Sequence, residues 1–148
     1  MNSPALHPAT DEDFRWLLGE RDATRPLRIA PDLAPPEVLA IVRGLPANWL
    51  IVVAREIVGI IGLKADGGEE VEIGYGVAAS REGRGHASGA VTALLPILEA
   101  RAVRLVNAET LIDNIASQRV LERNGFARVG ERVDEEDGPL YCWRKVLA

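Results

Sequence analysis

The 148-residue sequence predicts a single α+β domain. Apolar, β-branched runs of strand length occupy residues 49–54, 57–63 and 70–77, with short turns between them. Longer stretches with apolar residues at helical spacing lie on both sides of these runs. No linker, repeat or low-complexity segment divides the chain, and a chain of about 150 residues buries roughly 70% of its unfolded surface. One domain with one core is therefore expected.

The first third is predicted to hold one short strand and two helices. Residues 5–9 form the strand, and Thr10 caps a helix that has three acidic residues in its first turn. Residues 21–34 are predicted to be irregular, because two prolines interrupt any pattern. Pro35-Pro36 starts the second helix, since proline is tolerated in a first turn, and Gly44 ends it.

The middle of the chain is predicted to form three antiparallel strands. Arg55-Glu56 separates the first two strands as a hairpin turn, and Asp66-Gly67-Gly68 makes the second turn. Side chains alternate along a strand, so Glu72 shares a face with the glycines at 74 and 76. A glycine inside a strand often marks close approach by a ligand or another backbone.

The rest of the chain is predicted to alternate helix and strand before a closing hairpin. Pro96 interrupts the longest helix and is expected to kink it. Asn114 caps a shorter helix that Gly125 ends. The predicted elements are a helix over 85–101, a strand over 103–111, a helix over 114–124, and strands over 126–133 and 140–147 around an acidic turn.

Composition excludes several classes of protein. The net charge of −5 argues against a general nucleic-acid binder and is compatible with an amine partner. Cys142 is the only cysteine, and the two histidines lack ligand spacing, so neither a disulfide nor a metal site is expected. No signal peptide is recognised, and no apolar run reaches the ~18 residues of a membrane span. We expect a cytoplasmic protein that binds neither nucleic acid nor membrane, with a homodimer left open.

A glycine-rich loop, Glu82-Gly83-Arg84-Gly85-His86-Ala87-Ser88, is the most informative motif. It lies between a predicted strand and the start of a predicted helix. Backbone N–H groups and the helix dipole at such a place favour an anion such as a phosphate. Arg84 would add a charge-assisted contact.

A second segment follows the next strand, from Asp113-Asn114-Ile115-Ala116-Ser117 to Asn124-Gly125-Phe126. Together the two motifs resemble the GNAT superfamily of N-acetyltransferases, and within it the branch that acetylates ribosomal-protein N-termini. That family pairs a Gln/Arg-x-x-Gly-x-Gly/Ala loop with a downstream Asn-x-x-Ser and a helix that ends in Gly-Phe. The resemblance covers about half of the chain, from Glu69 to the C-terminus.

The resemblance implies a GNAT fold: three layers, α/β/α, around a mixed, mostly antiparallel sheet that splays at its centre. The strands of Glu72 and Asn107 would be adjacent and parallel, and then diverge to admit acetyl-CoA and an amine acceptor. The pantetheine arm would pair with the first strand near Tyr75 and Val77. The pyrophosphate would lie on the loop amides. The implied cofactor-binding residues are Tyr75, Val77, Gly83, Arg84, Gly85, His86, Ala87, Ser88, Asn114 and Ser117.

The chain departs from the family's pattern at two positions. Glu82 stands where the family has Gln or Arg, which places an acid beside the phosphate site. Many relatives stabilise the leaving thiolate with a tyrosine four residues before the glycine of Gly-Phe, but this chain has Leu121 there. In the branch that the chain most resembles, the serine of Asn-x-x-Ser lies close to the sulfur, so Ser117 is the predicted thiolate stabiliser.

The acceptor amine must lose a proton before it attacks a thioester. An amine of pKa about 10.4 costs about 4.6 kcal/mol to deprotonate at pH 7. A carboxylate relays that proton directly or through water. Glu72 is the first candidate, because it lies on the cofactor strand, and Glu109 on the facing strand is the second. Tyr75 is predicted to be a core residue that serves the cofactor through its backbone.

Two other functions stay open on the sequence. A dinucleotide-binding oxidoreductase would use Gly83-x-Gly85 with Glu109 roughly 20 residues on, although Ser88 occupies the third glycine position. A non-catalytic coenzyme A-binding module would explain Glu82 and the missing tyrosine.

Overall fold

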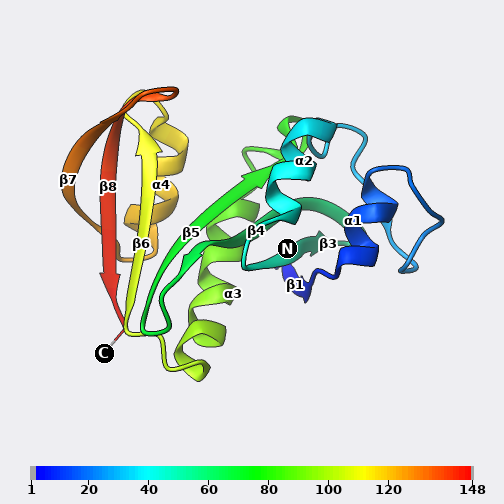
Figure 1. Ribbon diagram of the computed structural model, residues 1–148, viewed down its shortest axis with the longest axis horizontal. Coiled ribbons are helices and arrows are strands. Elements are labelled where there is room, and N and C mark those ends of the chain that lie inside the picture. The colour runs from blue at the N-terminus through cyan, green and yellow to red at the C-terminus, as the bar shows by residue number, and fades with distance from the viewer. Residues whose placement is uncertain (1–2, 148) are drawn as a thin grey trace.

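The structure, a computed structural model, describes residues 3–147. One mixed sheet runs in the order β1-β3-β4-β5-β6-β8-β7, and β2 pairs with β4 outside this path (Figure 1). The strands are β1 (Ala5–Pro8), β2 (Arg28–Ile29), β3 (Ala47–Val53), β4 (Glu56–Asp66), β5 (Glu70–Val77), β6 (Leu105–Leu111), β7 (Ala127–Asp134) and β8 (Gly138–Val146). The helices are α1 (Asp11–Leu17), α2 (Pro36–Arg43), the 3₁₀ turn η1 (Ala79–Arg81), α3 (His86–Ala100) and α4 (Ile115–Arg123).

The sheet splays at its centre, between β5 and β6. These parallel strands pair over only three positions, and Glu72 opposite Asn107 is the last pair. Beyond it, β5 continues along β4 to Val77, while β6 continues along β8 to Leu111. The two arms therefore diverge from a common base (Figure 1). This confirms the mostly antiparallel, centrally splayed sheet that the sequence resemblance implied.

Helices cover both faces of the N-terminal arm because its strands are apolar on both sides. Trp49 and Ile51 of β3 pack into the main core with α3, whereas Leu50 and Val52 pack with Trp16 of α1 on the opposite face. Leu121 of α4 and Trp143 of β8 extend the main core into the C-terminal arm. α3 and α4 thus share one side of the sheet, and the three-layer arrangement holds for the N-terminal arm.

Local backbone conformation corrects three sequence predictions. The β3–β4 turn is Ala54-Arg55 rather than Arg55-Glu56. Ala54 and Arg55 both adopt positive φ, as a tight type I′ turn requires, and Glu56 already pairs with Val53 as part of β4. The strand predicted from Val103 begins at Leu105, because Ala102 is left-handed and the Val103 N–H donates to Leu98 O, ending α3. Residues 21–34 include the short strand β2, which sequence patterns do not indicate.

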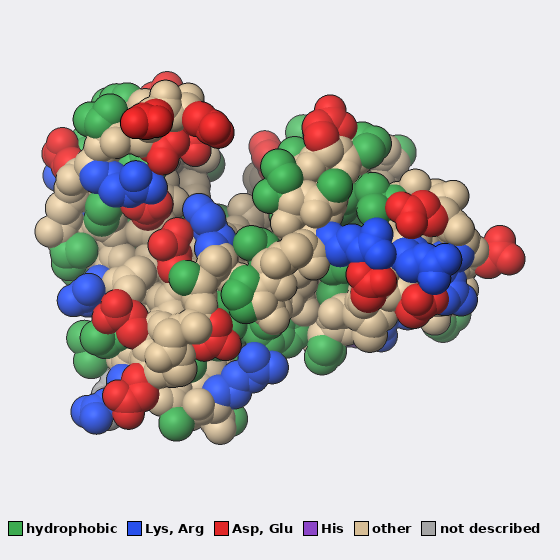
Figure 2. Space-filling model, in the orientation of Figure 1, with side chains coloured by type: hydrophobic (Ala, Val, Ile, Leu, Met, Phe, Trp, Pro, Cys, Tyr) green, Lys and Arg blue, Asp and Glu red, His purple; other side chains and the backbone are tan. Residues whose placement is uncertain are grey.

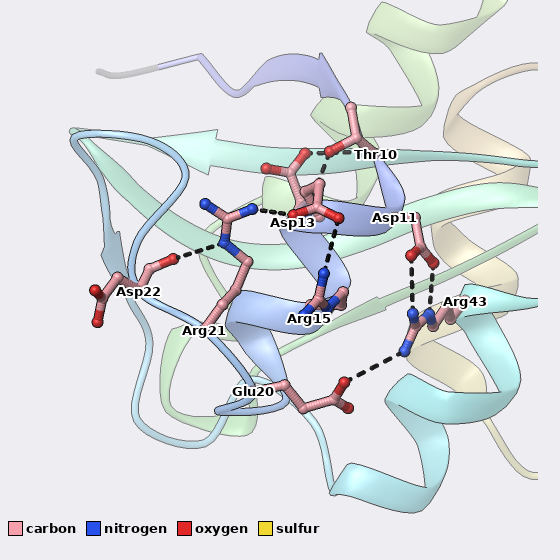
Figure 3. A network of polar contacts seen from close by, with 9 residues as sticks. Thr10, Asp11, Asp13, Arg15, Glu20, Arg21, Asp22 and Arg43 are labelled. Carbon is pink, nitrogen blue, oxygen red and sulfur yellow. Dashed lines mark hydrogen bonds and ion pairs between the residues drawn. The ribbon is translucent and has the colours of Figure 1, made fainter.

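Ion pairs hold the N-terminal helices against one another. Arg43 at the end of α2 donates from Nε and Nη2 to the Asp11 carboxylate of α1, and it also approaches Glu20 (Figure 3). Asp13 of α1 is almost fully buried. Its side chain accepts hydrogen bonds from Thr10 N, Thr24 Oγ1 and Arg25 Nη2 at 2.8, 2.5 and 2.9 Å.

We predict that Asp13→Asn destabilises the fold by about 2 kcal/mol at pH 7. Burial alone would raise the pKa of Asp13, but hydrogen bonds from Arg25, Thr24 and Thr10 outweigh burial and lower it to about 2. A carboxylate with a lowered folded-state pKa stabilises above its ordinary value of 3.8, and this stability is lost as pH falls toward 2. Urea unfolding measures both effects.

The control for this prediction is Glu12→Gln, because Glu12 pairs with Arg15 at the exposed surface of the same helix. It should leave the unfolding midpoint unchanged at pH 7. The slope of stability against pH between about 4 and 2 should flatten more in Asp13→Asn than in Glu12→Gln. Hydrogen bonds from Arg21 and Arg15 also lower the pKa of Glu12, but that carboxylate is exposed and its ion pairs are screened by solvent. Equal midpoints for the two variants would show that the buried network contributes nothing.

Candidate active site

Two cavities border the gap between β5 and β6 and share part of their lining. One, of about 820 Å³, is bounded by the glycine-rich loop and α4. The other, of about 780 Å³, is bounded by α2 and by the sheet face of β6, β8 and β7. Both are lined by Tyr75, Gly76, Val77, Glu82, Asn114 and Ser117. The two cavities therefore adjoin each other at these residues.

The first cavity, here the loop cavity, brings together the residues predicted to bind the cofactor. Nine of the ten line it, and only Arg84 does not. Gly83 and Gly85 have φ of +75° and +79°, a left-handed conformation that L side chains rarely adopt. Within residues 3–147, the N–H groups of residues 83 to 88 donate to no backbone or side-chain acceptor. These free amides at the start of α3 form a ready anion site.

Two arginines that the sequence analysis missed supply positive charge to this cavity. Arg119 and Arg123 lie on α4 four residues apart, share a face with Ala116 and Val120, and line the cavity. Arg81 also lines it but is held in an ion pair by Glu56, and Glu82 contributes the opposing charge. The helical spacing of 116, 119, 120 and 123 is the signal that would have identified the two arginines.

The start and end of α4 are fixed by asparagines. Asn114 Oδ1 accepts the Ser117 N–H at 3.1 Å and caps the helix, as predicted. At the other end, Asn124 Nδ2 donates to Ser88 O, and Thr92 Oγ1 donates to Asn124 Oδ1 at 2.7 Å. Asn124 therefore ties α4 to the first turns of α3 beside the loop cavity. Its side chain has a structural role that the Gly-Phe motif did not reveal.

Tyr75 has a hydroxyl function that its prediction as a core residue did not include. Its ring packs against the main core, but its Oη lies 3.0 Å from Ser117 Oγ and 3.2 Å from Ser117 O. Leu121, where many relatives have a tyrosine, is fully buried in the core. Of the α4 residues that line the loop cavity, only Ser117 carries a hydroxyl.

The second cavity, here the acceptor groove, has one apolar side and one charged side. Val38 and Ile41 of α2 line it and are 44% and 72% exposed. Its charged lining residues are five acids (Asp32, Glu82, Glu109, Asp134 and Asp137) and two bases (Lys64 and Arg132). Figure 2 shows the deep notch between the two arms, with hydrophobic side chains on the side of α2 and acidic side chains on the other.

The structure separates the two carboxylates proposed as proton acceptors. Glu109 lines the acceptor groove, and its carboxylate accepts two hydrogen bonds from Arg132. That guanidinium lowers the pKa of Glu109, although partial burial opposes the change. Glu72 lies at the base of the gap, 3.3 Å from Lys64 Nζ, and lines neither of the two cavities. Lys64 also fills the space beside Gly74, whereas the space beside Gly76 is open.

His86 begins α3 in the loop cavity. Partial burial, with the nearby positive charge of Arg84, lowers its pKa, so the imidazole is uncharged at neutral pH. An uncharged ring adds no net charge to this cavity, but it keeps one N–H group that can donate a hydrogen bond to an anion.

The sheet is opened at its centre, with free loop amides lining one side of the gap and an excess of acidic side chains lining the other. The chain matches the family description "Acetyltransferase (GNAT) domain" over residues 5–127. It therefore belongs to the GNAT acetyltransferases, enzymes that use acetyl-CoA. This decides against the dinucleotide-binding alternative. No curated protein sequence matches the chain at a significant level.

Solved structures share this fold over nearly the whole chain. A spermidine N-acetyltransferase chimera from Vibrio cholerae and hSSAT has a TM-score of 0.72 at 13% identity, covering 98% of this chain and 96% of its own. An acetyltransferase from Salmonella typhimurium that modifies the N-terminal serine of ribosomal protein L7/L12 has a TM-score of 0.71 at 22% identity. The match covers 97% of this chain and 95% of that protein. A ribosomal L7/L12 alpha-N-protein acetyltransferase in complex with coenzyme A has a TM-score of 0.73 at 20% identity. The match covers 97% of this chain and 94% of that protein.

The family match and the solved structures confirm the GNAT fold that was inferred from the glycine-rich loop and from the Asn114 to Phe126 segment. No helix within residues 3–147 is both long enough and apolar enough to cross a membrane. The roles of the individual site residues stay predictions.

Proposed function

We propose that this chain transfers the acetyl group of acetyl-CoA to a primary amine by direct attack of the amine on the thioester. The observation that carries the proposal is that Tyr75 and Ser117 line both the loop cavity and the acceptor groove. A donor held in one and an acceptor held in the other would meet in the gap without a covalent intermediate on the protein.

The positive charge of the loop cavity supports coenzyme A as its ligand. The free amides of residues 83 to 88 would hold its pyrophosphate, with Arg119 and Arg123 beside them for further phosphate charge. The edge of β5 beyond Glu72 is released from β6 and would pair with the pantetheine amides near Tyr75 and Val77. Acetyl-CoA supplies the activated acetyl group when bound, and no metal is proposed.

Ser117 is proposed to donate its hydroxyl hydrogen to the leaving sulfur. As the C–N bond forms and the C–S bond breaks, negative charge develops on sulfur, and a donor fixed beside it stabilises that charge. The Asn114 cap and the Tyr75 hydroxyl hold Ser117 in place before the reaction.

Glu109 is proposed to take the amine proton, through water, because it is the candidate carboxylate that lines the acceptor groove. The excess of acidic side chains there attracts a protonated amine, and the exposed Val38 and Ile41 suit an apolar part of the same molecule. The spermidine and N-terminal serine acceptors of the structural neighbours are both primary amines, which supports this class.

The test of the function is thiol release from acetyl-CoA against primary amines: spermidine, a peptide with a free N-terminus, and an aliphatic monoamine. We expect release with at least one of them and a kcat about 100-fold lower in Ser117→Ala, with KM for acetyl-CoA little changed. Tight binding of coenzyme A without release for any amine would instead support a non-catalytic module.

The loop cavity is tested by Gly85→Glu, which adds a negative side chain among the free amides. We expect calorimetric affinity for coenzyme A to fall at least tenfold. Gly68→Glu is the matched control: Gly68 also has positive φ and open space, but it lies in the distant β4–β5 turn. The proposal for the loop fails if both variants bind coenzyme A equally well.

The two carboxylates are compared through Glu109→Gln and Glu72→Gln. We predict that Glu109→Gln lowers kcat/KM for the amine about 100-fold and that Glu72→Gln changes it less than threefold. Because the pKa of Glu109 is lowered, this carboxylate stays ionised in the mildly acidic range, and the loss of wild-type rate there should follow protonation of the amine. The opposite ranking of the two variants would restore Glu72 as the base.

A further inference from the structure

We propose that Tyr75 is a positioning residue for the reaction: its hydroxyl donates to Ser117 Oγ and thereby directs the Ser117 hydrogen toward the leaving sulfur. The pair would take the place of the tyrosine that many relatives carry at the position of Leu121. The inference rests on the proposed function, because it needs Ser117 to act on the sulfur.

The contacts of Ser117 leave its hydroxyl few orientations. Its backbone N–H is bound by Asn114 Oδ1, and its backbone carbonyl and Oγ both face Tyr75 Oη, at 3.2 and 3.0 Å. Tyr75 comes from β5 and Ser117 from α4, so the contact crosses the splayed gap between the two arms. It is made where the loop cavity and the acceptor groove share their lining.

The number of hydrogens decides what the contact can do. A phenol has one hydrogen, so Tyr75 donates either to Ser117 O or to Ser117 Oγ. In the first arrangement Ser117 donates back to Tyr75 and its hydrogen is used. In the second arrangement Tyr75 is the donor, and the Ser117 hydrogen is free for a third group.

Negative charge on the sulfur would favour the second arrangement. A hydroxyl that accepts one hydrogen bond becomes a stronger donor to the next group in the chain. Burial raises the pKa of Tyr75, although the Ser117 hydrogen bond opposes the shift, so the phenol stays protonated and able to donate at neutral pH. No bond to Tyr75 forms or breaks: the C–S bond cleaves, and the sulfur receives its hydrogen bond from Ser117.

The test is Tyr75→Phe, which removes only the hydroxyl. We expect kcat for acetyl transfer to fall about fivefold to tenfold, the rate equivalent of one hydrogen bond, with coenzyme A affinity by calorimetry unchanged. Tyr141→Phe is the matched control, since Tyr141 lies in β8, stacks with Arg128, and lines neither cavity. It should keep the wild-type kcat.

A double-mutant cycle separates positioning from a merely structural role. If Tyr75 acts through Ser117, then adding Tyr75→Phe to Ser117→Ala lowers kcat no further. Wild-type kcat in Tyr75→Phe, or a full additional loss in the double variant, would overturn the inference. A slow Ser117→Ala beside a normal Tyr75→Phe would reject the inference alone, whereas absence of thiol release in the wild type would reject the proposed function itself.

Discussion

The whole site depends on where the hydrogen bonds between β5 and β6 stop. Three parallel pairs hold the arms together, and the last joins Glu72 to Asn107. Extending the ladder would close the gap, satisfy the edge of β5 internally, and leave no place for a second backbone. A shorter ladder would leave the contacts of Asn124 with the start of α3 and of Tyr75 with Ser117 as polar links between the arms. The enzyme is built on this short stretch of pairing.

The separation of the arms also explains why two cavities of similar size have different electrostatic character. The loop cavity takes its charge from backbone amides and from arginines of α4, so it suits an anion. The acceptor groove takes its charge from side chains of β6, of β7 and of the β7–β8 turn, where acids outnumber bases. The two sides of the shared lining thus differ in the sign of their charge.

The sequence predicted the fold well because its strongest local signals coincide with the elements that form the gap. The glycine-rich loop lies between β5 and the start of α3, where it was predicted, and Asn114 caps α4. It predicted the turn after β3 and the end of α3 less well, because alanine and arginine occupy left-handed positions there that local patterns assign to glycine. The site was predicted unevenly for a different reason. Whether Glu72 or Glu109 faces the groove depends on where the ladder ends, and the Tyr75 contact joins residues 42 positions apart.

The shared lining of the two cavities has an evolutionary consequence. Residues of α2 and of the β7–β8 turn line only the acceptor groove, whereas loop residues 83 and 85–88, with Arg119 and Arg123 of α4, line only the loop cavity. Under the proposed function, drift in the first set would change which amine is accepted while leaving cofactor affinity intact. The residues that line both cavities, among them Tyr75 and Ser117, would affect both substrates when substituted. They are therefore the part of the site with the least freedom to vary.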